Sequence, residues 1–238
     1  MKESGVGRYN PFEDAGQQSL SCGRGRASSF HPRFELASYI APERGAPRPE
    51  ETLMKSDRPP DGLTIFTIGH STRPIDRFIQ LLEANAVRQV IDIRTIPRSR
   101  HNPQFDSTAL AASLRAAHIR YVQLKELGGL RHARPDSINL GWRNQSFRGF
   151  ADYMQTPAFE GGLSRAIQWA KERPTALMCA EAVPWRCHRS LVADALTVRG
   201  IRVLEIVSDR PPAEHKLTPF ARVHGTSITY PADQASLV

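Results

Sequence analysis

The sequence predicts an α/β domain, a single open and mostly parallel sheet with helices on both faces, preceded by a disordered leader. Two observations predict the sheet. From residue 63 onward, short β-branched apolar runs alternate with longer amphipathic segments. The short runs are apolar at nearly every position, as in strands that are buried on both faces. Strands that alternate with helices pair in parallel through right-handed crossovers, which gives a doubly wound sheet.

The first sixty residues show no sustained apolar period. They contain 6 Gly, 7 Pro and 7 Ser, with charges of both signs, and such a composition buries too little apolar surface to offset the entropy of ordering. We therefore expect residues 1–60 to form a disordered leader and residues 61–238 to form one α/β domain. An alternative is that translation starts at Met54, because "MKSDRPPDG" leads directly into the first strand.

The first predicted strand is "LTIFTIGH" at 63–70, a β-branched apolar run with a glycine near its end. A helix is expected to follow, because Ser71 or Thr72 can cap its first turn. Apolar residues from Ile75 to Leu82 then recur at helical spacing and form one buried stripe.

The remaining elements continue this alternation. β-branched runs mark the strands, and segments with helical apolar spacing mark the helices; Asp106 stands at the start of one helix, and Gly200 ends another. In chain order, the sequence predicts a strand at 88–94, a helix at 106–118, a strand at 119–124, a helix at 158–171, a strand at 175–180, a helix at 185–199 and a strand at 202–207.

Composition argues against two classes of protein. The three cysteines, Cys22, Cys179 and Cys187, are odd in number and irregularly spaced, which argues against a secreted disulfide framework and for reduced thiols. No apolar run approaches the roughly 20 residues of a membrane-spanning helix, and no segment near Met1 resembles a signal peptide. We expect a soluble, cytoplasmic protein with no membrane partner.

Ionisable side chains follow four of the predicted strands. Open α/β sheets bind their ligands beyond the carboxyl ends of the strands, which lie at one edge. Although loops are often polar without having a function, four such groups at the same edge favour a site. They are His70 with Ser71, Asp92 with Arg94, Lys125 with Glu126 before a Gly-Gly pair, and Cys179 with Glu181.

The segment "MCAEAVPWRCHRS", residues 178–190, brings together two thiols, a carboxylate and an imidazole. A thiol near a helix N-terminus and a histidine can have a lowered pKa and act as a nucleophile, which makes Cys179 a candidate. Helical spacing places Cys187 and His188 on the inward face of the next helix, where His188 can reach Cys179 or Glu181. We expect Cys187 to be a small core residue.

Two arginines of this segment, Arg186 and Arg189, are expected to lie to the sides of the helix and to hold an anion. Known motifs do not fit the segment. A thiol phosphatase loop needs its arginine six positions after the cysteine, where the chain has Trp185. The cysteines are eight apart rather than three, and there is no glycine-rich dinucleotide or triphosphate loop.

A metal site is a further alternative for the segment. Cys179, Cys187 and His188 supply three ligands, and a fourth would have to come from elsewhere, such as His70 or His215. Structural zinc sites usually have four ligands in two spaced pairs, a pattern that this chain lacks. We therefore predict a site without a metal and leave the cofactor open.

The net charge of the predicted domain comes from one stretch. The chain carries a net charge of +8. Residues 88–148 contain eleven basic and four acidic side chains and therefore account for +7 of it. Phe105, Trp142 and Phe147 lie among them, and Phe150 follows just after. Basic residues with aromatics can bind a phosphate backbone and stack on its bases. The alternative is a solvated basic surface whose aromatic residues face the core.

Several short motifs resemble one known family. They are "TIGHS" after the first strand, "DIR" after the second, "ELGG" after the third, "FRGFADYM", "CAE", "CHR" and a late histidine before "LTPF". From about Thr64 to Pro231 the chain resembles the bacterial family catalogued as domain of unknown function 488. The resemblance implies an α/β fold but no settled activity. It draws attention to Asn144 and Arg148 without giving either residue a role.

The middle of the chain, "FRGFADYMQTPAFEGGL" at 147–163, allows two interpretations. Tyr153 and Phe159 can cover the crevice as a lid, because Gly149 and a Gly-Gly pair flank them. The alternative, which we favour, is that Phe150, Tyr153 and Met154 belong to an ordinary apolar stripe. The roles of His215 and His224, which follow the last predicted strand, are left open.

Two hypotheses for function remain. In the first, the protein is an enzyme that acts on a phosphate-bearing substrate, either a nucleotide or a nucleic acid. The catalytic candidates are His70, Asp92, Cys179, Glu181 and His188, and the substrate- or anion-binding candidates are Ser71, Arg94, Arg98, Lys125, Glu126, Arg131, Arg148, Arg186 and Arg189. In the second, the protein is a non-catalytic nucleic-acid-binding module. We favour the enzyme, because binding alone does not explain Glu181 in a basic crevice.

Overall fold

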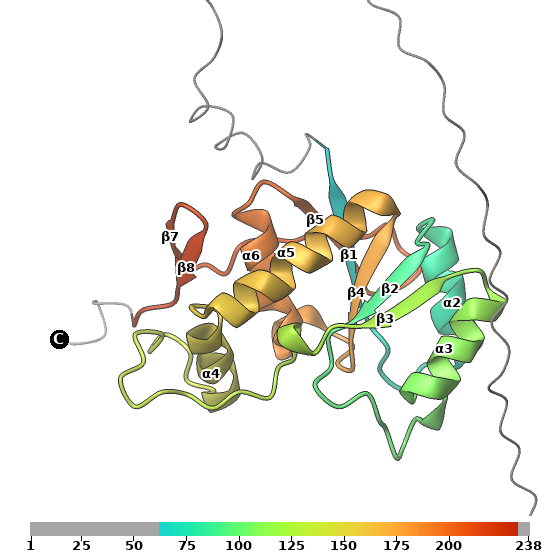
Figure 1. The fold of residues 1–238 in the computed structure, drawn as a ribbon, viewed down its shortest axis with the longest axis horizontal. Helices are drawn as coiled ribbons and strands as arrows, with labels where there is room; N and C mark the ends of the chain where they lie inside the picture. The colour runs from blue at the N-terminus through green and yellow to red at the C-terminus, as the bar shows by residue number, and fades with distance from the viewer. Residues whose placement is uncertain (1–61, 233–238) are drawn as a thin grey trace, which may run out of the picture. The chain divides into compact units, whose positions relative to one another are not determined.

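Residues 62–232 are the part of the chain that the computed structural model describes, and a six-stranded sheet lies at their centre (Figure 1). The spatial order is β3-β2-β4-β1-β5-β6, in which the first five strands are parallel and β6 is antiparallel. The predicted leader, residues 1–60, lies outside the described residues. The strands are β1 (Thr64–Gly69), β2 (Gln89–Asp92), β3 (Arg120–Gln123), β4 (Thr175–Cys179), β5 (Arg202–Ile206) and β6 (Ala213–Glu214).

Helices cover both faces of this sheet. Helices α2 and α3 pack on one face, and α4, α5 and α6 pack on the other (Figure 1). Side chains of β4 show the division, because Ala176 and Met178 face α2 and α3 whereas Leu177 and Cys179 face the other layer. The helices are α2 (Ile75–Ala84), α3 (Ser107–Ala116), α4 (Gln145–Tyr153), α5 (Pro157–Glu172) and α6 (Arg189–Thr197). The predicted doubly wound α/β fold is confirmed.

Two local predictions were wrong. The helix predicted at 185–199 is a 3-10 turn, η3 (Pro184–Arg186), followed by α6, and the two are separated because Cys187 has an extended backbone. Cys187 and His188 therefore precede the helix instead of lying on its face. The residue that caps α2 is Pro74, not Ser71 or Thr72, and Ser71 adopts a left-handed φ of 51° as the chain turns away from β1.

Three parts of the described fold were not predicted. They are α4, the edge strand β6, and a small antiparallel pair formed by β7 (Arg222–His224) and β8 (Ser227–Thr229). None of the helices between residues 62 and 232 is both long and apolar enough to cross a membrane.

A buried carboxylate joins the C-terminal part of the fold to α6. Asp194, which is 0% exposed, accepts hydrogen bonds from the hydroxyls of Thr218 and Tyr230 at 2.6 and 2.8 Å. It also accepts one from Nε2 of His215 at 2.8 Å, and the other ring nitrogen of His215 lies 2.7 Å from a carboxylate oxygen of Glu205 on β5. His215 therefore holds α6, β5 and the C-terminal segment together and takes no part in the predicted crevice. His224 lies exposed on β7.

The charge of His215 predicts a pH dependence of stability. Burial opposes that charge, but hydrogen bonds to Asp194 and Glu205 outweigh it and raise the pKa of His215 to about 9 from the ordinary 6.5. Its contribution to folding is complete below pH 6.5 and is lost as the pH rises through 9. We expect His215→Asn to lower the free energy of unfolding by about 2 kcal/mol at pH 6. Urea denaturation at pH 6 and pH 10 checks this, and a deficit that is the same at both pH values would contradict it.

Candidate functional site

A cavity of about 440 Å³ opens at the carboxyl edge of the sheet, beside the end of β4. This edge contains a topological switch point. Strands β1 and β2, which flank β4 in the sheet, lead to α2 and α3 on one face, whereas β4 leads to α6 on the other face. The connections therefore diverge at the end of β4. The cavity is lined by His70, Arg94, Thr95, Ile96, Arg98, Ser99, Gly129, Leu130, Ser146, Phe147, Cys179, Ala180, Glu181, Arg186, Cys187 and His188.

Two thiols and an imidazole meet at one wall of the cavity. Nδ1 of His188 lies 3.9 Å from Sγ of Cys179 and 3.7 Å from Sγ of Cys187. Its other nitrogen, Nε2, lies 3.2 Å from the carbonyl oxygen of Ile93 and 3.1 Å from that of Leu127. Because carbonyl oxygens only accept hydrogen bonds, the proton of the neutral imidazole is on Nε2. The lone pair of Nδ1 therefore points at the two sulfur atoms.

The ring of His188 is held between two neighbours. The Phe150 ring packs against it with a centroid separation of 4.9 Å. Gly129, from the "ELGG" segment, approaches it so closely that a Cβ at this position would overlap the ring. The glycine is therefore required by the position of His188, and any larger residue would displace the imidazole from the thiols.

The two thiols differ in acidity. A hydrogen bond from Cys187, together with the proximity of His188 and Arg189, outweighs burial and holds the pKa of Cys179 well below its ordinary value. The hydrogen bond to Cys179 and burial both raise the pKa of Cys187. One negative charge is thus favoured on the pair, and a second one beside it is opposed.

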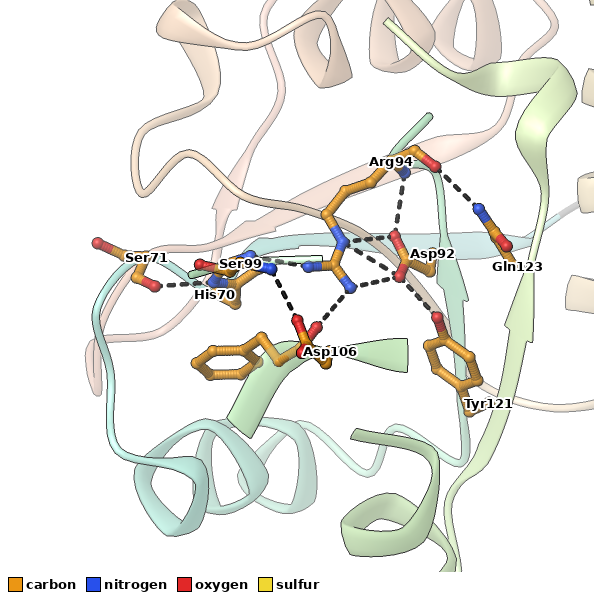
Figure 2. A network of polar contacts seen from close by, with 9 residues as sticks. His70, Ser71, Asp92, Arg94, Ser99, Asp106, Tyr121 and Gln123 are labelled. Carbon is orange, nitrogen blue, oxygen red and sulfur yellow. Dashed lines mark hydrogen bonds and ion pairs between the residues drawn. The ribbon is translucent and has the colours of Figure 1, made fainter. Parts of the chain in front are cut away.

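A second wall of the cavity is a buried ion pair (Figure 2). Asp92, at the end of β2, is 0% exposed, and its carboxylate oxygens accept hydrogen bonds from Nε and Nη2 of Arg94 at 2.6–3.1 Å. The hydroxyl of Tyr121 donates a further bond to the carboxylate at 2.7 Å. Nη2 of Arg94 also donates to the carbonyl oxygen of Phe105 at 2.8 Å. Asp92 therefore lies behind Arg94 and sets the position of its guanidinium.

Arg94 in turn fixes His70 (Figure 2). Nδ1 of His70 lies 2.7 Å from the carbonyl oxygen of Ser71, and Nε2 lies 3.2 Å from Nη1 of Arg94. The carbonyl only accepts and the guanidinium only donates, so His70 is neutral with its proton on Nδ1. Burial and the charge of Arg94 lower the pKa of His70, which agrees with this assignment. The ring also stacks on Phe105 at 4.2 Å.

The rim of the cavity carries three charged side chains that have no hydrogen bond or ion pair with another residue between 62 and 232. Arg98, Glu181 and Arg186 are all exposed. The two guanidiniums face the cavity from different segments, one after β2 and one in η3. Cations without a protein partner at the mouth of a concave site are suited to bind an anionic ligand.

Six predicted anion-binding residues lie outside the cavity lining, and four of them come from the segments around η2 and α4. Lys125 and Glu126 belong to a 3-10 turn, η2 (Lys125–Leu127), which packs against α5, and Glu126 pairs with Arg165 at 3.0 Å. The guanidinium of Arg131 lies over the Tyr153 ring at 3.6 Å. Nε of Arg148 donates to the carbonyl oxygen of Trp142 at 3.1 Å.

Arg189 was predicted to hold an anion and is instead a structural residue. Its side chain is buried, with the whole residue 1% exposed, and it donates to the carbonyl oxygens of Ile68 and Glu181 at 3.1 and 3.0 Å. These bonds join the end of β1 to the loop after β4. Ser71 does not line the cavity either and contributes only its carbonyl oxygen to His70.

The aromatic residues of the basic stretch face the core. Phe105 and Phe150 are fully buried, and the Trp142 ring packs on the Phe147 ring at 4.7 Å. Phe147 alone of the four also lines the cavity. The lid interpretation of 147–163 fails for a similar reason, since Phe159 is buried in the core and the hydroxyl of Tyr153 donates to the backbone of Glu126.

Sequence reasoning missed two contributors to the site. Cys187, expected to be only a core residue, is 4% exposed and also lines the cavity beside His188. Tyr121, on β3, was not considered, although its hydroxyl completes the environment of Asp92. The position of Cys187 next to His188 in the chain could have indicated its role. No local feature of the sequence indicated the role of Tyr121.

Comparison with known protein families matches residues 74–196, just over half of the chain, to the family described as "Domain of unknown function DUF488". The matched segment contains every residue that lines the cavity except His70. No curated protein and no solved structure matches the chain. The motifs that follow β2, β3 and β4 all lie within the match, and the chain belongs to the DUF488 family.

Proposed function

We propose that the protein is an enzyme that acts on a phosphate-bearing small molecule in this cavity, and that Cys179, Glu181 and His188 supply its chemistry. One observation carries the proposal. A thiol–imidazole cluster lines the same cavity as Arg98 and Arg186, which have no partner among the described residues, at the switch point where α/β sheets bind their ligands.

The thiol–imidazole cluster favours an enzyme over a binding module. Anion binding needs only the rim cations, and it does not require an imidazole whose free lone pair faces two thiols. The exposed carboxylate of Glu181 lines the same cavity and has no cation among the described residues as a partner. A carboxylate in an anion-binding cavity weakens binding, but it can serve as a general acid or base.

The shape of the site favours a small molecule over a nucleic acid. A volume of about 440 Å³ lies within the range of small-molecule pockets. Single-stranded nucleic acids are usually bound on a series of exposed aromatic side chains. Trp185 is exposed beside Arg186, but Phe105 and Phe150 are buried and Trp142 packs on Phe147. Arg98 and Arg186 are therefore assigned to the phosphate group of the substrate.

This assignment predicts ligand-dependent stabilisation. We expect at least one nucleoside phosphate or sugar phosphate to raise the melting temperature of the protein. Each compound is tested singly, with inorganic phosphate as a comparison. A ligand at 100 times its Kd stabilises the fold by about 2.7 kcal/mol, or roughly 5–10 °C for a domain of this size. In Arg98→Ala/Arg186→Ala, roughly tenfold weaker binding should remove about half of that shift.

Arg115→Ala is the matched control, because Arg115 is exposed on α3 and does not line the cavity. It should keep the full shift. Equal shifts in the wild type and the double variant would contradict the assignment. Salt-dependent binding of oligonucleotides that the double variant leaves intact would favour the nucleic-acid-binding alternative.

A further inference from the structure

The Cys179–Cys187–His188 cluster has the dimensions of a metal site. Sγ of Cys179, Sγ of Cys187 and Nδ1 of His188 all lie within 4.8 Å of one another, and the two sulfur–nitrogen distances are 3.9 and 3.7 Å. With zinc–sulfur bonds of about 2.3 Å and zinc–nitrogen bonds of about 2.0–2.1 Å, tetrahedral ligand atoms lie about 3.6–3.8 Å apart. Small side-chain rotations are enough to close the difference.

The surroundings of the cluster suit metal ligands. Nε2 of His188 donates to the carbonyl oxygens of Ile93 and Leu127, and such a hydrogen bond on the second nitrogen fixes the tautomer and orientation of a metal-binding imidazole. The backbone N–H of Arg189 donates to Sγ of Cys187 at 3.5 Å, a contact that stabilises negative charge on sulfur. Phe150 and Gly129 hold the ring so that Nδ1 stays directed at the thiols.

We infer that Cys179, Cys187 and His188 bind one zinc ion, with a fourth coordination position that faces the cavity. Two sulfur ligands and one imidazole select zinc over magnesium or calcium, which prefer oxygen ligands. On binding, both thiols release their protons to solvent, so that two thiolate charges balance the charge of the ion. The inference departs from the sequence-based prediction of a site without a metal.

The fourth position distinguishes this site from a structural one. Structural zinc sites are closed by four protein ligands, whereas catalytic sites have three and leave one position for water or substrate. Within residues 62–232, no further histidine, cysteine or carboxylate joins the cluster. His70 lines the same cavity, but its Nε2 already accepts from Arg94.

The chemical role of the ion rests on the proposed function, whereas its binding does not. At the open position the ion polarises an oxygen of the substrate or lowers the pKa of a bound water. Glu181 lines the same cavity and is assigned to accept the proton of that water. The substrate phosphate lies toward Arg98 and Arg186 at the rim.

Metal content tests the inference directly. Full-length protein, purified without chelators or a metal-affinity tag, should contain about one zinc ion per chain, as measured by elemental mass spectrometry. Cys179→Ser, Cys187→Ser and His188→Asn should each lose most of it. Cys22→Ser, the same substitution at the remaining cysteine, and Glu181→Gln, a cavity residue outside the ligand set, should both retain it.

Two measurements on the wild type test the inference even if the variants fail to fold. Cobalt added to chelator-treated protein should produce visible bands of tetrahedral cobalt and a sulfur-to-cobalt charge-transfer band in the near ultraviolet. Zinc should remove both. Alkylation by iodoacetamide, followed at the peptides of Cys179 and Cys187, should slow at least tenfold when zinc is added. Zinc-deficient wild type with no cobalt spectrum and no protection of the thiols would overturn the inference.

The outcomes separate this inference from the proposed function. Zinc bound by the three ligands without any stabilisation by phosphate compounds would support the metal site and count against the substrate assignment. Phosphate-dependent stabilisation that needs Arg98 and Arg186, in a protein that binds no zinc, would overturn the metal site. It would leave a metal-free thiol enzyme as the proposed function.

Discussion

Asp194→Ala is expected to lower the free energy of unfolding by about 3–5 kcal/mol, because it breaks a buried ion pair and leaves the His215 cation with Glu205 as its remaining carboxylate partner. Asp194 is 0% exposed and accepts hydrogen bonds from His215, from the backbone and hydroxyl of Thr218, and from Tyr230. Its loss unpairs these donors inside the protein, which adds the cost of unsatisfied polar groups. Urea denaturation at pH 7, followed by circular dichroism, measures the effect.

Two further variants define the cause. Asp194→Asn keeps the size of the side chain and one acceptor oxygen, so it should lose less stability than alanine. Asp136→Ala removes an exposed aspartate whose pairing with Arg134 lies at the surface, and it should leave the free energy of unfolding almost unchanged. If Asp194→Ala destabilises no more than Asp136→Ala, the buried cluster does not hold the C-terminal segment to α6.

The parallel strands were predictable because their signal is local. Each strand from β1 to β5 lies inside its predicted run. The central strands β1, β2 and β4 are buried at most positions, and strands buried on both faces are largely apolar. β3, at the edge of the sheet, is only partly buried. The alternation with helices then determined the carboxyl edge and brought Cys179 and His188 to it. β6 and the pair β7–β8 carry no such run, because these strands are two or three residues long and mostly exposed.

The roles of the charged residues were harder to predict. Arg186 and Arg189 are three positions apart, yet one is exposed at the rim and the other is buried against carbonyl oxygens. The difference depends on the break between η3 and α6 at Cys187, which an uninterrupted helix does not contain. His215 likewise has partners 10 and 21 residues away, on β5 and α6, and only the folded chain shows them.

Spacing rules counted against the metal ligands that we propose, which the sequence offered only as an alternative. Motifs for zinc rely on ligands paired within one turn or loop, whereas here one sulfur comes from the end of a central strand and the other ligands from a turn eight residues later. The sheet brings them together, because Cys179 faces the same layer as the turn before α6. A pattern that depends on the end of a strand has no fixed spacing in the sequence.

Arg94→Met carries the second large expected effect, because it leaves Asp92 charged and fully buried. The carboxylate loses three side-chain hydrogen bonds and keeps those from Tyr121 and the backbone N–H of residue 94. Breaking a buried pair in this way costs about 3–5 kcal/mol. His70 loses its hydrogen bond from Arg94 and keeps the one to the Ser71 carbonyl, so one wall of the cavity loosens as well. Urea denaturation measures the loss of stability.

The double variant Asp92→Asn/Arg94→Met identifies the source of that cost. Asparagine has no charge and keeps an acceptor for Tyr121, so the double variant should recover much of the stability that Arg94→Met loses. Arg94→Lys keeps a charge but cannot bind both carboxylate oxygens and a carbonyl with a planar group, and it should fall between the wild type and Arg94→Met. A double variant no more stable than Arg94→Met would show that lost packing, not the unpaired carboxylate, causes the destabilisation. In that case the main role of the ion pair at the cavity would be to orient His70. The pH dependence of the His70 ring signals in nuclear magnetic resonance can test this role.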